Sequence, residues 1–172
     1  MLSAFVISQI LIGIAFLFDL ASFQFKKREV TLFCFFTAAT LISAHYFLLE
    51  QNTAGAVIAL SAVRFLVSIF SQDKRLKYLF LLLITIAGIV TFDEVIDLLL
   101  IATGYFATFA VFQPDDKLLR RLMFGSSICV ISFNILIFTP VGIFVEIFFL
   151  GSNLLSYWRF YIRKQKKRYE NT

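Results

Sequence analysis

The sequence contains few residues that would end an apolar helix and few that commonly carry out chemistry. Among its 172 residues there are two prolines, two cysteines, one tryptophan and one histidine. A lone histidine with Cys34 and Cys129, which lie far apart in apolar runs, is not the ligand pattern of a zinc site or a disulfide framework. Serine-hydrolase, HExxH and glycine-rich phosphate-binding signatures are also absent. We therefore expect no enzymatic activity, no metal and no cofactor.

Charge is scarce as well, and apolar residues dominate. Charged residues make up 16% of the chain and hydrophobic residues 60%, with 23 phenylalanines and a mean hydropathy of +0.87. A water-soluble domain of this size does not have such a composition. The composition indicates an integral membrane protein.

Polar clusters divide the chain into apolar segments close to the roughly 20 residues that cross a bilayer as a helix. The breaks are short, so neighbouring helices are expected to run antiparallel. The sequence thus predicts an all-α membrane protein with seven transmembrane helices, at 4–25, 30–49, 54–72, 77–92, 95–113, 119–139 and 141–160.

The basic residues predict the orientation of these helices. With the N-terminus outside and the C-terminus cytoplasmic, fifteen of the sixteen Lys and Arg lie on the cytoplasmic side, as the positive-inside rule requires. The exception is Arg64, which lies within an apolar helix. A basic rim facing anionic headgroups accounts for the net charge of +5, so we expect membrane lipids as partners and no nucleic acid.

The first three predicted helices are similar to the last three. Residues 13–16 align with 104–107, His45 with Asn134, and 54–56 with 141–143. Because three crossings end on the opposite side of the membrane, a second three-helix unit that followed directly would be inverted relative to the first. One additional crossing between the two units restores their parallel orientation. We therefore predict two parallel triple-helix bundles joined by a linker helix, with boundaries at 1–75, 76–93 and 94–162 and a basic cytoplasmic tail at 163–172.

These segments also carry a family resemblance. The chain resembles the YgjV-like family of bacterial inner membrane proteins in 8–9, 13–17, 45–49, 54–56, 62–64, Gly142, Glu146, Asn153 and 158–160. The resemblance implies a multi-pass protein of the bacterial inner membrane. The predicted 3+1+3 architecture is similar to that of SWEET and PnuC transporters, although spans one and five lack the Pro-Gln pair of PQ-loop proteins.

A set of polar residues lies near the predicted bilayer midplane. Arg64 falls almost at the centre, and Glu146 lies on the corresponding face of the repeat-equivalent helix. One interpretation is a structural Arg64–Glu146 ion pair that fixes helix packing. The other is a polar cavity in which Arg64 binds a solute and Glu146 carries a proton. The remaining candidate solute-binding residues are Asn134, Asn153, His45, Gln9 and Ser61.

Two further residues have alternative interpretations. Asp19 is either a coupling-ion site or a headgroup or helix-end contact, and His45 is either a proton relay or a hydrogen-bonded interfacial histidine.

The sequence as a whole favours a transporter or facilitator of a small polar metabolite that works by alternating access between the two bundles. A non-transporting scaffold or accessory protein is the alternative, and a lipid-modifying enzyme is the third class. Either a monomer or an oligomer is compatible with this architecture.

Overall fold

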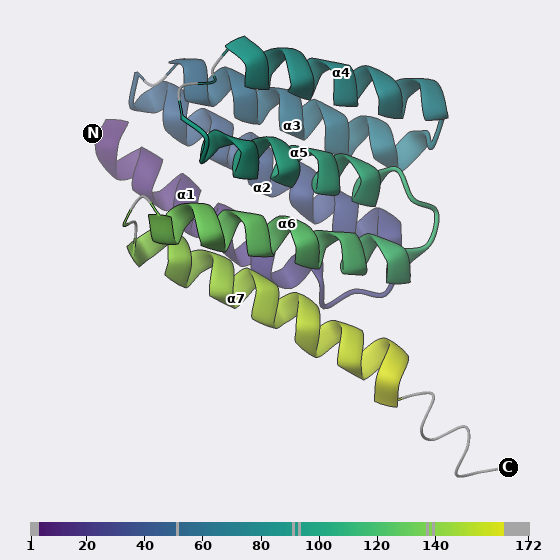
Figure 1. The fold of residues 1–172 in the computed structure, drawn as a ribbon. Helices are drawn as coiled ribbons and strands as arrows, with labels where there is room; N and C mark the ends of the chain where they lie inside the picture. Colours follow the sequence, from purple (N-terminus) through teal and green to yellow (C-terminus); the bar gives the residue numbers. More distant parts are fainter. Residues whose placement is uncertain are drawn as a thin grey trace, which may run out of the picture. The chain divides into compact units, whose positions relative to one another are not determined.

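The computed structural model describes residues 4–50, 52–90, 92, 94–136, 138 and 140–163. In this part of the chain the secondary structure is entirely helical, which confirms the predicted all-α class (Figure 1). The SWEET-like arrangement and the orientation of the termini stay predictions. The predicted basic tail lies, after Arg163, outside the described residues. The helices are α1 (Ala4–Ser22), α2 (Arg28–Leu48), α3 (Asn52–Phe70), α4 (Lys74–Val90), α5 (Asp97–Val111), α6 (Asp116–Leu136), α7 (Pro140–Tyr157) and the π-helix η1 (Trp158–Ile162).

Several of these helices have the length and hydropathy of membrane spans. Among the described residues, Ala4–Ser22, Arg28–Leu48 and Asp116–Leu136 are long and apolar enough to cross a bilayer. Val57–Phe70 and Asp97–Val111 are shorter apolar helices. The membrane class is thus supported, whereas the full number of seven crossings stays a prediction.

Aspartates in two of the polar breaks cap the helices that follow them. The Asp73 carboxylate accepts a hydrogen bond from the backbone N–H of Arg75 at 2.8 Å. Asp115 accepts from the N–H groups of Lys117 and Leu118 at 3.1 and 3.3 Å. These bonds satisfy amide groups that have no partner within the first turn of a helix. The two polar breaks therefore determine where α4 and α6 begin.

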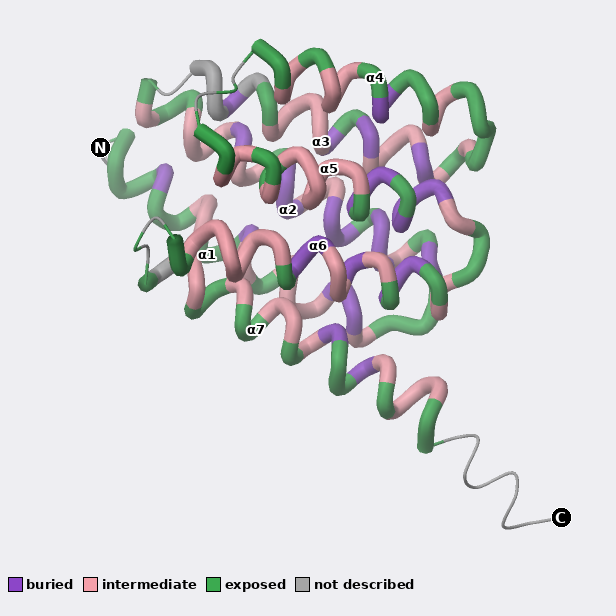
Figure 2. Tube along the Cα trace, in the orientation of Figure 1, coloured by how far each residue is buried: buried purple, intermediate pink, exposed green. Residues whose placement is uncertain are grey.

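Residues 1–71 form one compact unit, in which α2 packs against both α1 and α3. Helix α1 presents Ser8, Ala15 and Ser22 at seven-residue spacing, and each of them is fully buried. Small residues on one face allow helix backbones to approach closely, which is the usual basis of helix association in lipid. Figure 2 shows the buried positions of this unit along the tube.

Residues 72–172 form the second unit, in which α6 packs against α5 and α7, and α4 packs against α5. The α4–α5 contact uses a glycine on each helix. A Cβ on Gly88 would lie 2.7 Å from Ile101, and one on Gly104 would lie 2.9 Å from Ile84. By its contacts α4 belongs to the second unit. The predicted role of 76–93 as a linker between 1–75 and 94–162 stays a prediction.

Alanine substitutions will test this packing. Gly88→Ala and Gly104→Ala should each destabilise the protein by about 1–3 kcal/mol, because the β-branched isoleucines opposite them adapt poorly. A Cβ on Gly13 or on Gly151 would have no atom of a neighbouring residue within 4 Å, so alanine there should be neutral or stabilising by up to about 1 kcal/mol. Equilibrium unfolding in mixed micelles measures all four. Equal changes in the free energy of unfolding at all four sites would contradict the described packing of α4 against α5.

The two units share local features at corresponding places. Phe23-Gln24 follows α1, and Phe112-Gln113 follows α5. Two residues after α2 and α6, Glu50 and Phe138 adopt left-handed backbone conformations with φ of 60° and 55°. Such a conformation is a common way to end a helix, but it is unusual for residues other than glycine.

The helix that follows each of these turns begins with a close approach to the preceding helix. A Cβ on Gly55 would lie 3.0 Å from Phe47, and one on Gly142 would lie 2.8 Å from Asn134. Shared turns and shared close contacts are what an internal repeat predicts.

Candidate functional site: a polar seam between α6 and α7

The first turns of α6 contain a buried ion pair. Arg120 is fully buried, and its Nε lies 2.7 Å from Oδ2 of Asp116, whose side chain is 10% exposed. The hydroxyl of Tyr161, in η1, donates a hydrogen bond to the same carboxylate oxygen. The Asp116 carboxylate therefore connects the start of α6 to the end of the α7–η1 segment.

Tyr161 is held in its neutral, hydrogen-bond-donating form. Burial, together with the hydrogen bond to Asp116, raises the pKa of its phenol above the ordinary value for tyrosine. Tyr161 thus stays protonated at physiological pH and continues to donate to the carboxylate. The Arg120 guanidinium also lies 5.4 Å from the centre of the Phe160 ring.

Helix α7 contributes buried polar side chains opposite this pair. Nδ2 of Asn153 donates to the backbone carbonyl of Arg120 at 3.0 Å, and Asn153 is fully buried. Ser156, almost one turn later, is fully buried as well. Within the described part of the chain, Oδ1 of Asn153 and Oγ of Ser156 have no hydrogen-bond partner.

The same interface continues toward the other ends of α6 and α7. The partly buried Glu146 side chain lies near the hydroxyl of Ser127. Ser127 is 1% exposed, and the geometry of its hydroxyl relative to Glu146 does not meet the criteria for a hydrogen bond. Asn134 packs against the backbone of Gly142. We refer to the side chains along this interface as the polar seam: Asp116, Arg120, Ser127, Asn134, Glu146, Asn153 and Ser156.

In the first unit, Arg64 lies on α3, about 4.5 Å past the helix midpoint toward the C-terminal end. It is 7% exposed, and its guanidinium carbon lies 5.0 Å from the centre of the Phe65 ring. The hydroxyl of Ser61 bonds to the Val57 carbonyl of its own helix at 3.4 Å. Burial of an arginine in an apolar helix is the feature that the sequence singled out.

The other candidates of the first unit lie on α1 and α2. Nδ1 of His45 is 2.9 Å from the backbone carbonyl of Ser8, so Nδ1 carries the proton of that hydrogen bond. The exposed Gln9 donates to the Ser8 hydroxyl at 3.4 Å, so His45 and Gln9 bond to different atoms of the same residue. Asp19 lies within electrostatic range of Cys34.

The candidates therefore fall into two groups, one described in each unit. Asn134, Glu146 and Asn153 line the α6–α7 interface of the second unit, and His45 and Gln9 each bond to Ser8 in the first. Arg64 and Glu146 belong to different units, so their predicted pairing stays a prediction.

Comparison with known proteins identifies the family. The family model Imp-YgjV, described as a bacterial inner membrane protein, matches residues 6–164. The chain belongs to this family. It is 28% identical to Inner membrane protein YgjV of Escherichia coli (strain K12) over 152 residues, which cover 87% of this chain and 80% of that protein. No solved structure is significantly similar to the chain.

Membership of this family confirms the first part of the resemblance stated from the sequence. The chain is a bacterial inner membrane protein, and its long apolar helices agree with that location. Neither the family description nor the name of the relative specifies an activity.

Sequence reasoning missed the Asp116–Arg120–Tyr161 group. From the sequence, Arg120 was assigned only to the basic rim, and Asp116 and Tyr161 were not among the candidates. The spacing of four residues between Asp116 and Arg120 is typical of an ion pair on one helix face and could have indicated it. The role of Tyr161 had no signal in the sequence, because the tyrosine is 45 residues away from its partner along the chain.

Proposed function

We propose that the protein transports a small polar metabolite across the bacterial inner membrane. The observation that carries this proposal is the set of buried polar atoms in the seam, above all Oδ1 of Asn153 and Oγ of Ser156. Leaving a buried polar atom without a hydrogen bond costs about 1–3 kcal/mol. Water or a polar solute that enters the seam would relieve this cost.

The proposal assigns a role to each group of candidate residues. Glu146, Asn134 and Asn153 bind the solute in the second unit, and Glu146 also carries a proton. Arg64, Ser61, His45 and Gln9 contribute binding groups from the first unit, and Asp19 is the candidate for a coupling ion. In the proposed mechanism the chain crosses the membrane seven times with its N-terminus outside. Transport occurs when one SWEET-like bundle moves against the other.

A scaffold or accessory role is the second candidate, and specific hydrogen bonds favour it. Arg28 on α2 donates to the Ser68 carbonyl on α3 at 2.8 Å, in a buried position. Asn153 makes an equivalent contact from α7 to α6. Polar side chains that join neighbouring helices in this way stabilise a membrane bundle without any solute.

Uptake into proteoliposomes tests the proposal. Vesicles containing the purified chain are compared with empty vesicles across a panel of labelled sugars, amino acids, nucleosides and vitamins, with and without a pH gradient. We expect protein-dependent uptake of at least one class, and Glu146→Gln should lower it at least tenfold. Glu94→Gln removes the same charge from an exposed residue and should leave uptake unchanged.

Two results would contradict the proposal. Uptake across the panel that never exceeds that of empty vesicles would favour the scaffold role. Uptake that Glu146→Gln and Glu94→Gln affect equally would remove Glu146 from the solute pathway.

A further inference from the structure

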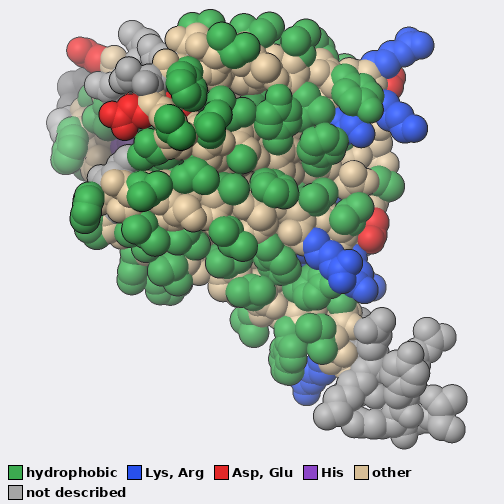
Figure 3. Space-filling model, in the orientation of Figure 1, with side chains coloured by type: hydrophobic (Ala, Val, Ile, Leu, Met, Phe, Trp, Pro, Cys, Tyr) green, Lys and Arg blue, Asp and Glu red, His purple; other side chains and the backbone are tan. Residues whose placement is uncertain are grey.

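The start of α6 and the π-helix η1 form a strongly basic edge of the second unit. Lys117 and Arg121 lie one turn apart on α6 and are therefore neighbours on its surface. Figure 3 shows basic side chains at this end of the second unit beside hydrophobic ones. This edge contains two carboxylates, Asp115 and Asp116. It contains five cations: Lys117, Arg120, Arg121, Arg159 and Arg163.

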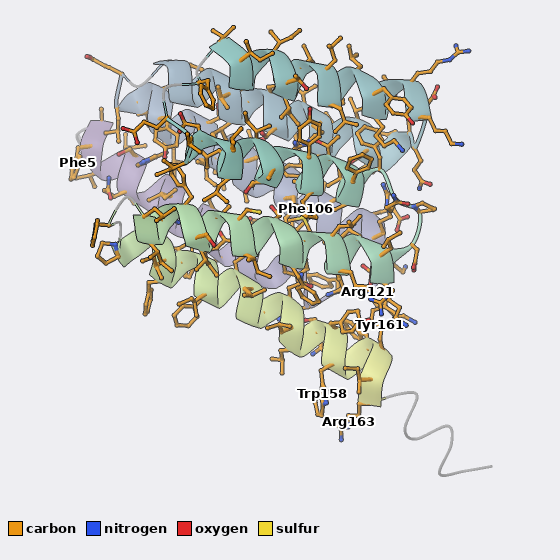
Figure 4. All side chains as sticks on the ribbon, viewed as in Figure 1. Phe5, Phe106, Arg121, Trp158, Tyr161 and Arg163 are labelled. Atoms are coloured by element: carbon orange, nitrogen blue, oxygen red, sulfur yellow. The ribbon has the colours of Figure 1, made fainter. Side chains whose placement is uncertain are left out.

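Aromatic rings lie beside the exposed Arg121 and the partly exposed Lys117 and hold both cations in place. Nε of Arg121 donates to the hydroxyl of Tyr157 at 2.9 Å, and its guanidinium lies 5.9 Å from the centre of that ring. The ammonium group of Lys117 lies 5.8 Å from the ring centre of Tyr161, which is itself 5.4 Å from the Tyr157 ring. Figure 4 shows Arg121 and Tyr161 next to each other. Side chains held in this way lose less conformational entropy when they bind an anion.

The nearby carboxylates do not cancel this positive charge. The charge of Asp116 is compensated by Arg120, and the hydroxyl of Tyr161 donates a hydrogen bond to the same carboxylate. Asp115 is engaged in capping α6. Four cations, Lys117, Arg121, Arg159 and Arg163, therefore remain against the single charge of Asp115.

An apolar surface continues from the basic edge along α7 and η1. Leu154, Leu155, Trp158 and Ile162 are between 47% and 57% exposed. Trp158 directly follows Tyr157, and tryptophan is enriched at the depth of the headgroups and upper acyl chains. Arg163, 5.8 Å from the Trp158 ring, adds a further cation (Figure 4). A cationic site bordered by exposed apolar side chains matches a molecule with an anionic head and hydrocarbon chains.

We propose that this edge is a binding site for an anionic phospholipid. Lys117 and Arg121 contact the phosphodiester of the headgroup, because a guanidinium fork and an ammonium group suit phosphate oxygens. The acyl chains lie along Trp158 and the leucines of α7. The continuous apolar surface favours a lipid over free phosphate, which would use only the two cations.

The chain contains a single tryptophan, Trp158, which provides a probe at the site. The protein is reconstituted in phosphatidylcholine vesicles that contain brominated phosphatidylglycerol or brominated phosphatidylcholine, and quenching of Trp158 fluorescence is measured. We expect stronger quenching by the anionic lipid at equal mole fraction. Lys117→Gln/Arg121→Gln should reduce this preference about tenfold, since each basic group near a membrane surface contributes substantially to the attraction of anionic lipid.

The matched control is Lys74→Gln/Arg75→Gln. This variant removes the same charge from two exposed residues at the start of α4, and it should keep the preference. Inorganic phosphate at matched ionic strength should not compete with the brominated lipid.

Three results would overturn the proposal: equal quenching of the unmodified protein by both lipids, equal losses in the two double variants, and displacement of the lipid by phosphate alone. The last would identify a site for free anions. Circular dichroism of each variant confirms that its helices are retained.

Discussion

Asp116→Ala should destabilise the second unit by about 3–5 kcal/mol, which is the expected cost of removing one partner of a buried ion pair. Arg120 is fully buried, and the substitution takes away the carboxylate that compensates its charge. Tyr161 loses its acceptor at the same time, so η1 loses a connection to α6. Equilibrium unfolding in mixed micelles, followed by circular dichroism, measures the loss.

Two controls show whether the buried charge is the cause. Asp116→Ala/Arg120→Met removes both charges and should recover most of the stability, because an apolar replacement of a buried pair is often neutral. Asp115→Ala removes an exposed capping carboxylate of the same turn and should cost about 1 kcal/mol. If Asp116→Ala cost no more than Asp115→Ala, the buried pair would not contribute to stability as described.

Arg64→Met/Glu146→Met should abolish solute uptake while the protein remains folded. Methionine is apolar and of similar length, so the double variant leaves no buried charge without compensation. The proposed transport function requires the charged groups themselves, so uptake should fall to the level of empty vesicles in the double variant and in both single variants. Uptake and unfolding are measured on the same reconstituted preparations.

A purely structural role of Arg64 and Glu146 predicts a different pattern for these variants. If the two residues form a purely structural ion pair, each single substitution should destabilise the protein by about 3–5 kcal/mol, and the double variant should be stable and functional. Arg75→Met changes an exposed arginine and serves as the control for loss of basic charge. A stable double variant with unchanged uptake would remove both residues from the solute pathway.

The helical class and the membrane location could be predicted from the sequence because both depend on local properties. Long apolar stretches with few prolines form helices and partition into lipid, whatever their neighbours are. The polar breaks could also be predicted, and Asp73 and Asp115 in two of them cap the following helices. Glu146, Asn134 and Asn153 were recognised as candidates because polar side chains are rare in apolar helices.

The partners of these residues were decided only by the tertiary structure. Whether an arginine near a helix start extends to the headgroups or is buried depends on what packs over it. Arg120 is buried and bonded to Asp116, whereas Arg121, the next residue, is exposed and bonded to Tyr157. Packing of α7 and η1 against α6 makes this difference between adjacent, identical side chains, and helix packing depends on contacts between residues that are distant in the sequence.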